Sequence, residues 1–275
     1  MTELAGTTIE LDVQPPAGLL IDTHCHLDDQ SFREDLSEVL AESMASGVRS
    51  WINVGFEPER WDSTLRLVDR FPGMSCMLGI HPTSATAYSG ETLDRMRRLL
   101  LASDAVAIGE IGLDLLRERE TESIQRQAFE AQLDLALELR LPVVIHMRDA
   151  EAEMLSVLAA RPTLPPLLFH SFDGGPALTE FILASGAYVG VGGLATRQKS
   201  ESLRAELQKI PLQRMVLETD SPYLVPARQK ARRNTPAQIR TIASFLATLL
   251  AIDEDQVVHT TTINAWSYFG RLPIA

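Results

Sequence analysis

The chain alternates short apolar runs with longer amphipathic stretches, and it repeats this alternation eight times. Runs that are apolar on both faces are typical of strands covered on both sides, and the stretches between them have helical spacing. This alternation indicates βα units built around a parallel sheet. The predicted strands are Leu19–Asp22, Ser50–Val54, Ser75–Ile80, Ala105–Ile111, Pro142–His146, Leu167–Phe169, Ala187–Val191 and Met215–Leu217.

Helix signals are clearest at three places. Apolar residues recur every three or four positions through Ile124–Leu139, which predicts an amphipathic helix. Thr235 followed by Pro236 is typical of a capped helix start. A last helix is expected from about Asp253 to Phe269, with its end at Gly270.

Eight βα units favour a closed barrel over an open sheet. A (β/α)8 barrel typically needs about 250 residues, and the 275-residue chain supplies them. A two-domain arrangement has little support, because no linker rich in Gly, Ser or Pro divides the chain. We therefore expect an α/β protein with a single TIM-barrel domain over residues 18–275, preceded by a flexible leader of residues 1–17.

The composition limits the classes of function. With 37 acidic against 25 basic residues, the net charge of −12 argues against a protein that coats nucleic acid, although a short polyanion held by metal is compatible with it. No apolar run is long enough for a membrane span, and Glu3, Glu10 and Asp12 do not fit a signal peptide, so a cytoplasmic location is expected. Cys25 and Cys76 cannot form a disulfide scaffold, and both are predicted to be buried.

Five of the six histidines lie at or just after the ends of predicted strands. In a parallel barrel the carboxyl ends of the strands converge on one face, where barrel enzymes carry their chemistry. Two carboxylates join them there, Glu110 in the fourth run and Asp220 after the eighth. A carboxylate in an apolar strand needs a cation or strong hydrogen-bond donors. The five histidines are His24, His26, His81, His146 and His170.

These side chains predict a metal site. His24 and His26 alternate on one strand and share a face, so both imidazoles can bind one cation while Cys25 points away. Six ligands are more than one catalytic ion needs, so we expect two divalent ions bridged by Glu110. Nitrogen and oxygen donors favour Mg²⁺, Mn²⁺, Zn²⁺ or Ni²⁺ over an iron–sulfur centre. The expected ligands are His24, His26, Glu110, His146, His170 and Asp220.

Two further polar residues are less clear. Glu218 fits either a partner of a ligand histidine or a salt bridge at the rim of the site. His259 falls inside a predicted helix, where a structural role is expected.

A basic cluster follows Asp220 in the loop after the last strand. Loops in this part of a barrel often bind phosphate, so we expect the cluster to contact substrate together with Arg148, which lies at the same rim. The members of the basic cluster are Arg228, Lys230, Arg232 and Arg233.

Taken together, the motifs resemble those of the TatD family of metal-dependent deoxyribonucleases, within the amidohydrolase superfamily. The matching blocks extend from Ile21 to Phe269 and so span nearly the whole chain. They are Ile21–Asp28, Gly79–Pro82, Gly109–Asp114, Pro142–Arg148, His170–Gly174, Glu218–Leu224, Arg233–Pro236 and Asn264–Ala265.

The resemblance implies a barrel that holds two divalent ions and hydrolyses phosphodiester bonds at the ends of DNA, with RNA as an alternative substrate. It places His81 near the scissile phosphate, and Asn234 belongs to a block where substrate contacts are expected. The implied ligands are His24, His26, Glu110 and Asp220 for one ion, and Glu110, His146 and His170 for the other.

Three departures from the family pattern concern the substrate side of the site. Thr83 stands where the family commonly has a second histidine, and Leu115 and Leu116 stand where an aromatic residue is common. Thr235 replaces a frequent glutamate. The ligand set is intact, whereas the choice of substrate is left open.

In the expected mechanism, two ions lower the pKa of a shared water and stabilise the leaving oxygen. Asp220 orients or deprotonates that water, and Glu110 and His81 complete the catalytic set. The same ligands would also serve an amidohydrolase or an esterase acting on another substrate, such as aminoacyl-tRNA, although Glu110 stands where phosphotriesterase-like relatives have a carboxylated lysine. A subunit with restricted activity in a larger assembly is a third alternative.

Overall fold

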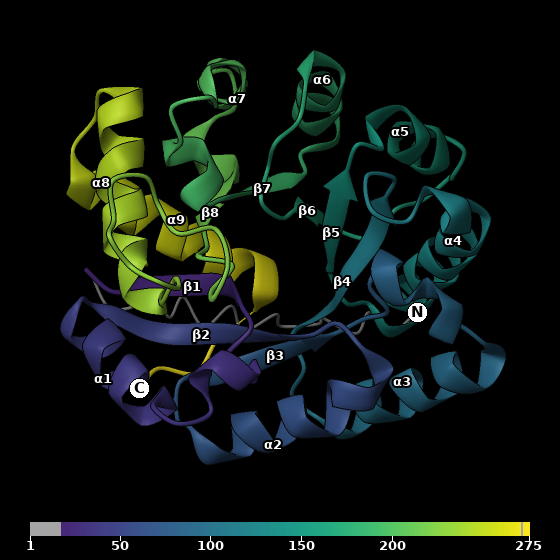
Figure 1. The fold of residues 1–275 in the computed structure, drawn as a ribbon. Helices are drawn as coiled ribbons and strands as arrows, with labels where there is room; N and C mark the ends of the chain where they lie inside the picture. The colour runs from purple at the N-terminus through teal and green to yellow at the C-terminus, as the bar shows by residue number, and fades with distance from the viewer. Residues whose placement is uncertain (1–17, 271) are drawn as a thin grey trace, which may run out of the picture.

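Eight parallel strands pair side by side in sequence order, from β1 next to β2 through to β8. The computed structural model describes residues 18–270 and 272–275, so the predicted leader of residues 1–17 lies outside the described residues. A bridge between Cys25 and Ser221 brings the two edges of the sheet together. The predicted (β/α)8 barrel is thereby confirmed (Figure 1). The strands are β1 (Leu20–Cys25), β2 (Val48–Gly55), β3 (Met74–Leu78), β4 (Ala107–Asp114), β5 (Val143–Arg148), β6 (Leu167–Phe169), β7 (Tyr188–Val191) and β8 (Met215–Leu217).

The helices that connect the strands surround the sheet (Figure 1). Within the described residues, no helix is both long and apolar enough to cross a membrane. The helices are α1 (Leu36–Ala45), α2 (Trp61–Arg70), α3 (Gly90–Ala102), α4 (Glu122–Leu139), α5 (Glu151–Ala159), α6 (Pro176–Ser185), α7 (Glu201–Leu207), α8 (Ile239–Leu250) and α9 (Glu254–Phe269).

Successive residues of a strand pack on opposite faces of the sheet. In β5, Val143 and Ile145 belong to the large core between sheet and helices, whereas Val144 belongs to a smaller core inside the barrel. Leu168 of β6 and Val216 of β8 also face the interior. This alternation explains why the strands are apolar throughout: each one is buried on both sides.

Helix α9 closes the amino-terminal end of the barrel. Its residues Tyr268 and Phe269 belong to the interior core. The Tyr268 hydroxyl donates to the carbonyl oxygens of Val143 at 2.7 Å and Pro166 at 2.9 Å, where β5 and β6 begin. The opposite, carboxyl-terminal face is thus the one available for a site.

Two glutamines of α4 fix the carboxyl ends of β3 and β4. Gln132 exchanges hydrogen bonds with the backbone N–H and carbonyl of Ile80, at 2.7 and 3.2 Å. Gln125 does the same with the backbone of Asp114, at 2.9 and 3.2 Å. Both glutamines are buried, seven residues apart on one face of the helix. They position the segment that leads to His81 and the end of the strand that carries Glu110.

Most strand boundaries differ from the predicted ones by one to three residues, as in β1, which ends at Cys25 and not at Asp22. β4 continues to Asp114, three residues beyond the predicted end at Ile111, because Gln125 caps its last peptide group. Helix α8 begins at Ile239 after a 3-10 turn over residues 236–238, and the Thr235 side chain makes no capping hydrogen bond. The predicted last helix is confirmed, with its end before Gly270.

The contact between β4 and β5 gives a test of the fold. Gly112 has φ of +145°, and a Cβ there would lie 1.9 Å from the carbonyl oxygen of His146. We predict that Gly112→Ala lowers the free energy of unfolding by about 3 kcal/mol or more, because the backbone has to shift. Urea denaturation measures this, and Gly90→Ala is the matched control, since a Cβ at Gly90 meets nothing within 4 Å. Equal stability of the two variants would contradict the packing of β4 on β5.

Candidate metal centre

The six predicted ligands converge at the carboxyl ends of the strands. A cavity of about 990 Å³ opens there, and all of them except the fully buried His24 line it. Alternate residues of a strand face the same side of the sheet. His146 and His170 lie two residues after Val144 and Leu168, which face the barrel interior, so both imidazoles face the interior as well. The ligands come from β1 and its end (His24, His26), β4 (Glu110), β5 (His146), the end of β6 (His170) and the loop after β8 (Asp220).

Glu110 lies at the middle of the group. Its side chain is buried, and its two oxygens face different imidazoles. Oε1 lies 2.6 Å from Nδ1 of His146 and 3.2 Å from Nε2 of His170. Oε2 lies 3.4 Å from Nε2 of His24. One carboxylate is therefore shared by two sets of nitrogen donors, an arrangement compatible with a bridging ligand.

His24, His26 and Asp220 form the other side of the centre. Nε2 of His26 lies 3.2 Å from Oδ1 of Asp220, and Nε2 of His24 lies 3.8 Å from the same atom. Asp220 has a left-handed φ of 56°, which Asp adopts more readily than most residues, and its N–H donates to the carbonyl of His24. One atom from each of the three side chains lies within 4.8 Å of the others, close enough to bind one ion.

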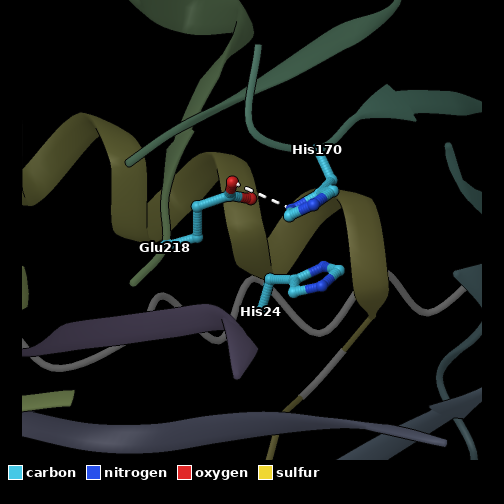
Figure 2. A group of neighbouring side chains, drawn as sticks. All are labelled: His24, His170 and Glu218. Carbon is cyan, nitrogen blue, oxygen red and sulfur yellow. Dashed lines mark hydrogen bonds and ion pairs between the residues drawn. The ribbon is translucent and has the colours of Figure 1, made fainter. Parts of the chain in front are cut away.

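Three buried imidazole nitrogens of the site have no hydrogen-bond partner among the described residues. They are Nδ1 and Nε2 of His24 and Nδ1 of His26. The His24 ring instead stacks on the His170 ring, with centroids 3.7 Å apart (Figure 2). Histidines that only fill a core are hydrogen-bonded, because an unpaired buried polar atom costs free energy. Unpaired nitrogens beside carboxylates form a donor set that fits a divalent cation.

The buried carboxylates and imidazoles shift one another's pKa values. Burial works to raise the pKa of Glu110, but the nearby imidazoles, led by His170, hold it well below its ordinary value. Burial works to lower the pKa of His170, yet the charges of Glu218 and Glu110 raise it to about 10. Without a metal, His170 is therefore protonated at neutral pH. An ion that binds this imidazole has to displace the proton, so metal affinity should rise with pH.

Glu218 is fully buried, which excludes a salt bridge at the rim. Its Oε1 accepts hydrogen bonds from Nδ1 of His170 at 3.1 Å and from the N–H of Ser171 at 2.5 Å. Figure 2 shows the carboxylate directed at the His170 ring. Nε2 of His170 is then the nitrogen that faces Glu110. Of the two interpretations of Glu218, the structure favours the one in which it orients a histidine.

Asp114 is a residue whose role the sequence did not reveal. Its Oδ2 lies 3.2 Å from Nε2 of His146, while Oδ1 accepts from the backbone N–H groups of Leu116 and Arg117. Burial works to raise the pKa of Asp114, but the hydrogen bonds from His146 and the Arg117 backbone, together with the positive charges of these two side chains, outweigh it and lower the pKa to about 2. The available signal was its spacing, since Asp114 lies four residues after Glu110 on the same strand.

A buried network supports the turn that carries Asp220. Asp22 accepts hydrogen bonds from the Thr219 hydroxyl at 2.6 Å and from its backbone N–H at 2.9 Å. The Thr219 hydroxyl also lies 2.9 Å from that of Ser221. All three residues are buried. Asp22 therefore ties β1 to the end of β8, on which the position of Asp220 depends.

His81 is oriented by Thr83. The backbone N–H of Thr83 donates to Nδ1 of His81 at 3.2 Å, and the Thr83 hydroxyl lies 2.7 Å from the same nitrogen. An Nδ1 that accepts this bond leaves the ring proton on Nε2, which lies 3.5 Å from Oε1 of Glu110. Burial lowers the pKa of His81, so the neutral form is favoured.

The basic cluster after β8 does not line the cavity, contrary to the prediction. Arg233 turns outward: its guanidinium contacts Asp35 and the carbonyl of Ser31, and it lies 4.6 Å from the ring of Phe32. These partners hold it beside α1, which explains why it does not reach the cavity. The other members, Arg228, Lys230 and Arg232, are exposed outside the cavity wall.

Asn234 is also placed differently from the prediction. It is fully buried, and its amide donates to the carbonyl of Thr219 at 2.8 Å and more weakly to that of Leu224 at 3.4 Å. Asn234 therefore supports the loop after β8 and does not face the cavity. Arg148 does line the cavity, as predicted, and three arginines that the sequence did not single out line it too: Arg117, Arg119 and Arg197.

The remaining predicted residues behave as structural side chains. Cys25 and Cys76 are buried, and the Cys25 thiol donates to the carbonyl of Ile52, away from the histidines. His259 is exposed on α9, the helix at the other end of the barrel.

The family of TatD related DNases matches residues 21–270. The chain belongs to the TatD family. The 3'-5' ssDNA/RNA exonuclease TatD of Cronobacter sakazakii is 34% identical over 256 residues, which cover 91% of this chain and 97% of that protein. The uncharacterized metal-dependent hydrolase YabD of Bacillus subtilis is 29% identical and covers 91% of this chain and 99% of its own length. The expected class, a metal-dependent hydrolase, agrees with these TatD relatives.

Solved structures share the barrel fold, and one of them is a TatD homologue. YJJV, a TatD homologue from Escherichia coli, superposes with a TM-score of 0.86 at 29% identity and covers 91% of this chain and 97% of its own. An uncharacterized amidohydrolase from Saccharomyces cerevisiae superposes with a TM-score of 0.82 at 18% identity, covers 91% of this chain and 99% of its own, and shares the fold.

The pairing of Glu218 with His170 can be tested without metal. We predict that Glu218→Gln lowers the pKa of His170 from its raised value, because the strongest charge that favours the protonated ring is lost. An NMR titration of the imidazole in metal-free protein measures the shift. Glu206→Gln, which removes a carboxylate elsewhere in the fold, should leave the His170 titration unchanged. Equal titration curves in both variants would mean that Glu218 does not act on His170.

Proposed function

We propose that this TatD family member is a two-metal phosphodiesterase that removes nucleotides from the ends of single-stranded DNA or RNA. The observation that carries the proposal is the placement of Glu110, whose Oε2 faces His24 while its Oε1 faces His146 and His170. The name of the Cronobacter sakazakii relative, a 3'-5' ssDNA/RNA exonuclease, supports the substrate class. A cavity of about 990 Å³ is large enough to admit the end of a strand.

The donor set divides naturally into two parts around Glu110. Oε2 of Glu110 faces His24 and Oε1 faces the imidazoles of β5 and β6. We assign the ions to these two sides, with Glu110 as their common ligand. The ligands are His24, His26, Glu110 and Asp220 on one side, and Glu110, His146 and His170 on the other.

Two divalent ions bound there would acidify a water molecule and neutralise charge on the phosphate and the leaving oxygen. Asp220 accepts the proton of the attacking water. Burial works to raise the pKa of Asp220, but the hydrogen bond from His26 and the neighbouring imidazoles outweigh it, so the carboxylate is ionised and able to act as a base.

His81 acts on the substrate as a neutral donor. Its Nε2 proton faces the same space as Glu110, because Thr83 occupies Nδ1. A phosphate oxygen held beside Glu110 would accept this hydrogen bond, which stabilises the charge that develops during hydrolysis. Thr83 thus fixes the tautomer of His81 in this chain.

The bridging assignment predicts unequal effects on metal content. Glu110→Ala should lose both ions, because only this carboxylate serves the two sides, whereas His170→Ala should lose one. Elemental analysis after reconstitution and gel filtration counts the ions, and circular dichroism checks the fold. A folded Glu110→Ala protein that retains two ions would disprove the bridge.

The role of Asp220 predicts a loss of rate. Asp220→Asn should reduce turnover of a single-stranded oligonucleotide by about a hundredfold or more, because the proton acceptor is removed. Asp173→Asn is the control, since Asp173 also lines the cavity but forms no contact with the ligand group within hydrogen-bond distance. Normal turnover by folded Asp220→Asn would move the base elsewhere.

The proposed substrate is tested by comparing single-stranded DNA, duplex DNA and RNA in the presence of Mn²⁺ and after chelation. Metal-dependent shortening of single strands from an end is the expected result. If no polynucleotide is shortened but an aminoacyl ester is hydrolysed, the esterase alternative replaces this proposal, because the same metal-activated water can attack a carbonyl.

A further inference from the structure

The cavity wall has two parts that differ in chemistry. Arginines from the loops after β4 and β7 and from the end of β5 form one part, which we call the cationic wall: Arg117, Arg119, Arg148 and Arg197. Two aromatic side chains, Phe56 and Tyr223, form the other part, the aromatic wall. Glu110 and its histidines lie between the two.

Strand order places most of the cationic wall across the barrel mouth from the aromatic wall. Phe56 follows β2 and Tyr223 lies in the loop after β8, and β1 lies between these strands once the barrel closes. Strands β4 and β5, which carry Arg148 and lead to Arg117, lie on the other side of the ring, whereas β7, which precedes Arg197, pairs with β8 (Figure 1). A molecule that spans the mouth from Tyr223 therefore meets Arg197 on the neighbouring loop and the remaining guanidinium groups on the far side.

Most of the cationic wall is available to an anion. Arg117, Arg148 and Arg197 are exposed, and within residues 18–270 and 272–275 no carboxylate lies within ion-pair distance of them. Arg119 lies 3.4 Å from Asp149, and this pair is open to solvent. Guanidinium groups are well suited to phosphate, because they donate several hydrogen bonds in one plane.

Carboxylates share this side of the cavity, and two of them have partners of their own. Glu151 accepts hydrogen bonds from the N–H groups of Gly175 and Leu178 at the start of α6. Asp149 faces Arg119. The others, Glu153 and Asp173, form no ion pair with the cationic wall.

The aromatic wall lies beside the metal centre. Tyr223 is 49% exposed, and its ring centroid lies 5.7 Å from that of His26. Phe56 packs edge-on against the same imidazole at 5.1 Å. An aromatic side chain that keeps half its surface exposed next to a reaction centre offers a face on which a base can stack.

We propose that a single strand binds across the cavity with its terminal base on Tyr223 and its following phosphates on Arg117, Arg148 and Arg197. This rests on the proposed function, because it places the scissile phosphate at the centre between the walls. Few phosphates are contacted, and the chain as a whole has a net charge of −12, which repels a longer strand. Affinity should therefore stop rising after the first few nucleotides.

Direct binding tests the cationic wall. Fluorescence anisotropy with an eight-nucleotide thymidine strand, made with phosphorothioate linkages that resist hydrolysis, gives Kd over a range of salt concentrations. The double variant Arg117→Gln/Arg197→Gln should raise Kd about tenfold and reduce the slope of log Kd against log salt by about 1.4, since each phosphate contact on a single strand contributes about 0.7.

The basic cluster supplies a matched control. Arg228→Gln/Arg232→Gln removes the same amount of charge from residues outside the cavity wall. Its Kd should stay within about twofold of wild type. Equal weakening by the two double variants would mean that only net charge matters, and it would overturn the assignment of the cationic wall.

The aromatic wall is tested with the terminal base. Tyr223→Leu should weaken binding about tenfold, the size of one lost stacking interaction, whereas Tyr223→Phe keeps the stacking face and should bind as wild type does. A strand with an abasic terminal nucleotide should bind wild type and Tyr223→Leu alike. Placing the abasic nucleotide at the 5' or the 3' end then shows which end enters. Equal loss with intact and abasic strands would overturn the role of Tyr223.

Hydrolysis of bis(4-nitrophenyl) phosphate by the Mn²⁺-loaded wild type separates this inference from the proposed function. The small diester reports the metal centre without a strand. If the small diester is hydrolysed but the variants show none of the binding differences above, the proposed strand-binding role of the two walls is wrong, whereas the proposed phosphodiesterase activity is retained. If the binding differences are observed but neither the small diester nor any oligonucleotide is hydrolysed, the proposed phosphodiesterase activity is wrong, whereas the proposed strand-binding surface is retained.

Discussion

The site depends on one constraint, the burial of the Glu110 carboxylate inside an apolar barrel. An ionised group there costs several kcal/mol unless positive charge surrounds it. The chain meets this requirement by placing His24, His146 and His170 at or near the carboxyl ends of β1, β5 and β6, from where they face the carboxylate. The nitrogens of His24 that find no partner show that side chains alone do not complete the arrangement. Divalent cations would satisfy both the carboxylate and the unpaired nitrogens.

The surroundings of the centre hold its geometry in place. Glu218 and Asp114 each bind one nitrogen of a histidine, and Asp22 ties the turn of Asp220 to β1. These groups are buried, so their hydrogen bonds are shielded from water and maintain a defined orientation. The glutamines of α4 form no hydrogen bond to the ligands, but they fix the backbone at the ends of β3 and β4. Such support fits the need of metal catalysis for ligands held in fixed positions.

Periodicity explains which parts were predictable from the sequence. The apolar runs predict strands that are covered on both faces. The two-residue repeat of a strand then predicts that His146 faces the barrel interior. The fold and the ligand set were therefore predicted together. The same repeat, counted from Val216, would have placed Glu218 inside the barrel. Asp114 was missed because β4 runs past its predicted end. Loop residues follow no such repeat, so their directions could not be predicted from the sequence. Arg233 points toward Asp35, and the arginines that line the cavity come from other segments.

The most direct test of the central claim is a crystal structure of Mn²⁺-loaded protein with an anomalous difference map measured at the manganese edge. Two peaks should appear on either side of Glu110, one bound by His24, His26 and Asp220 and the other by His146 and His170. A single peak, or a peak that Glu110 does not contact, would contradict the account of one buried carboxylate shared by two ions.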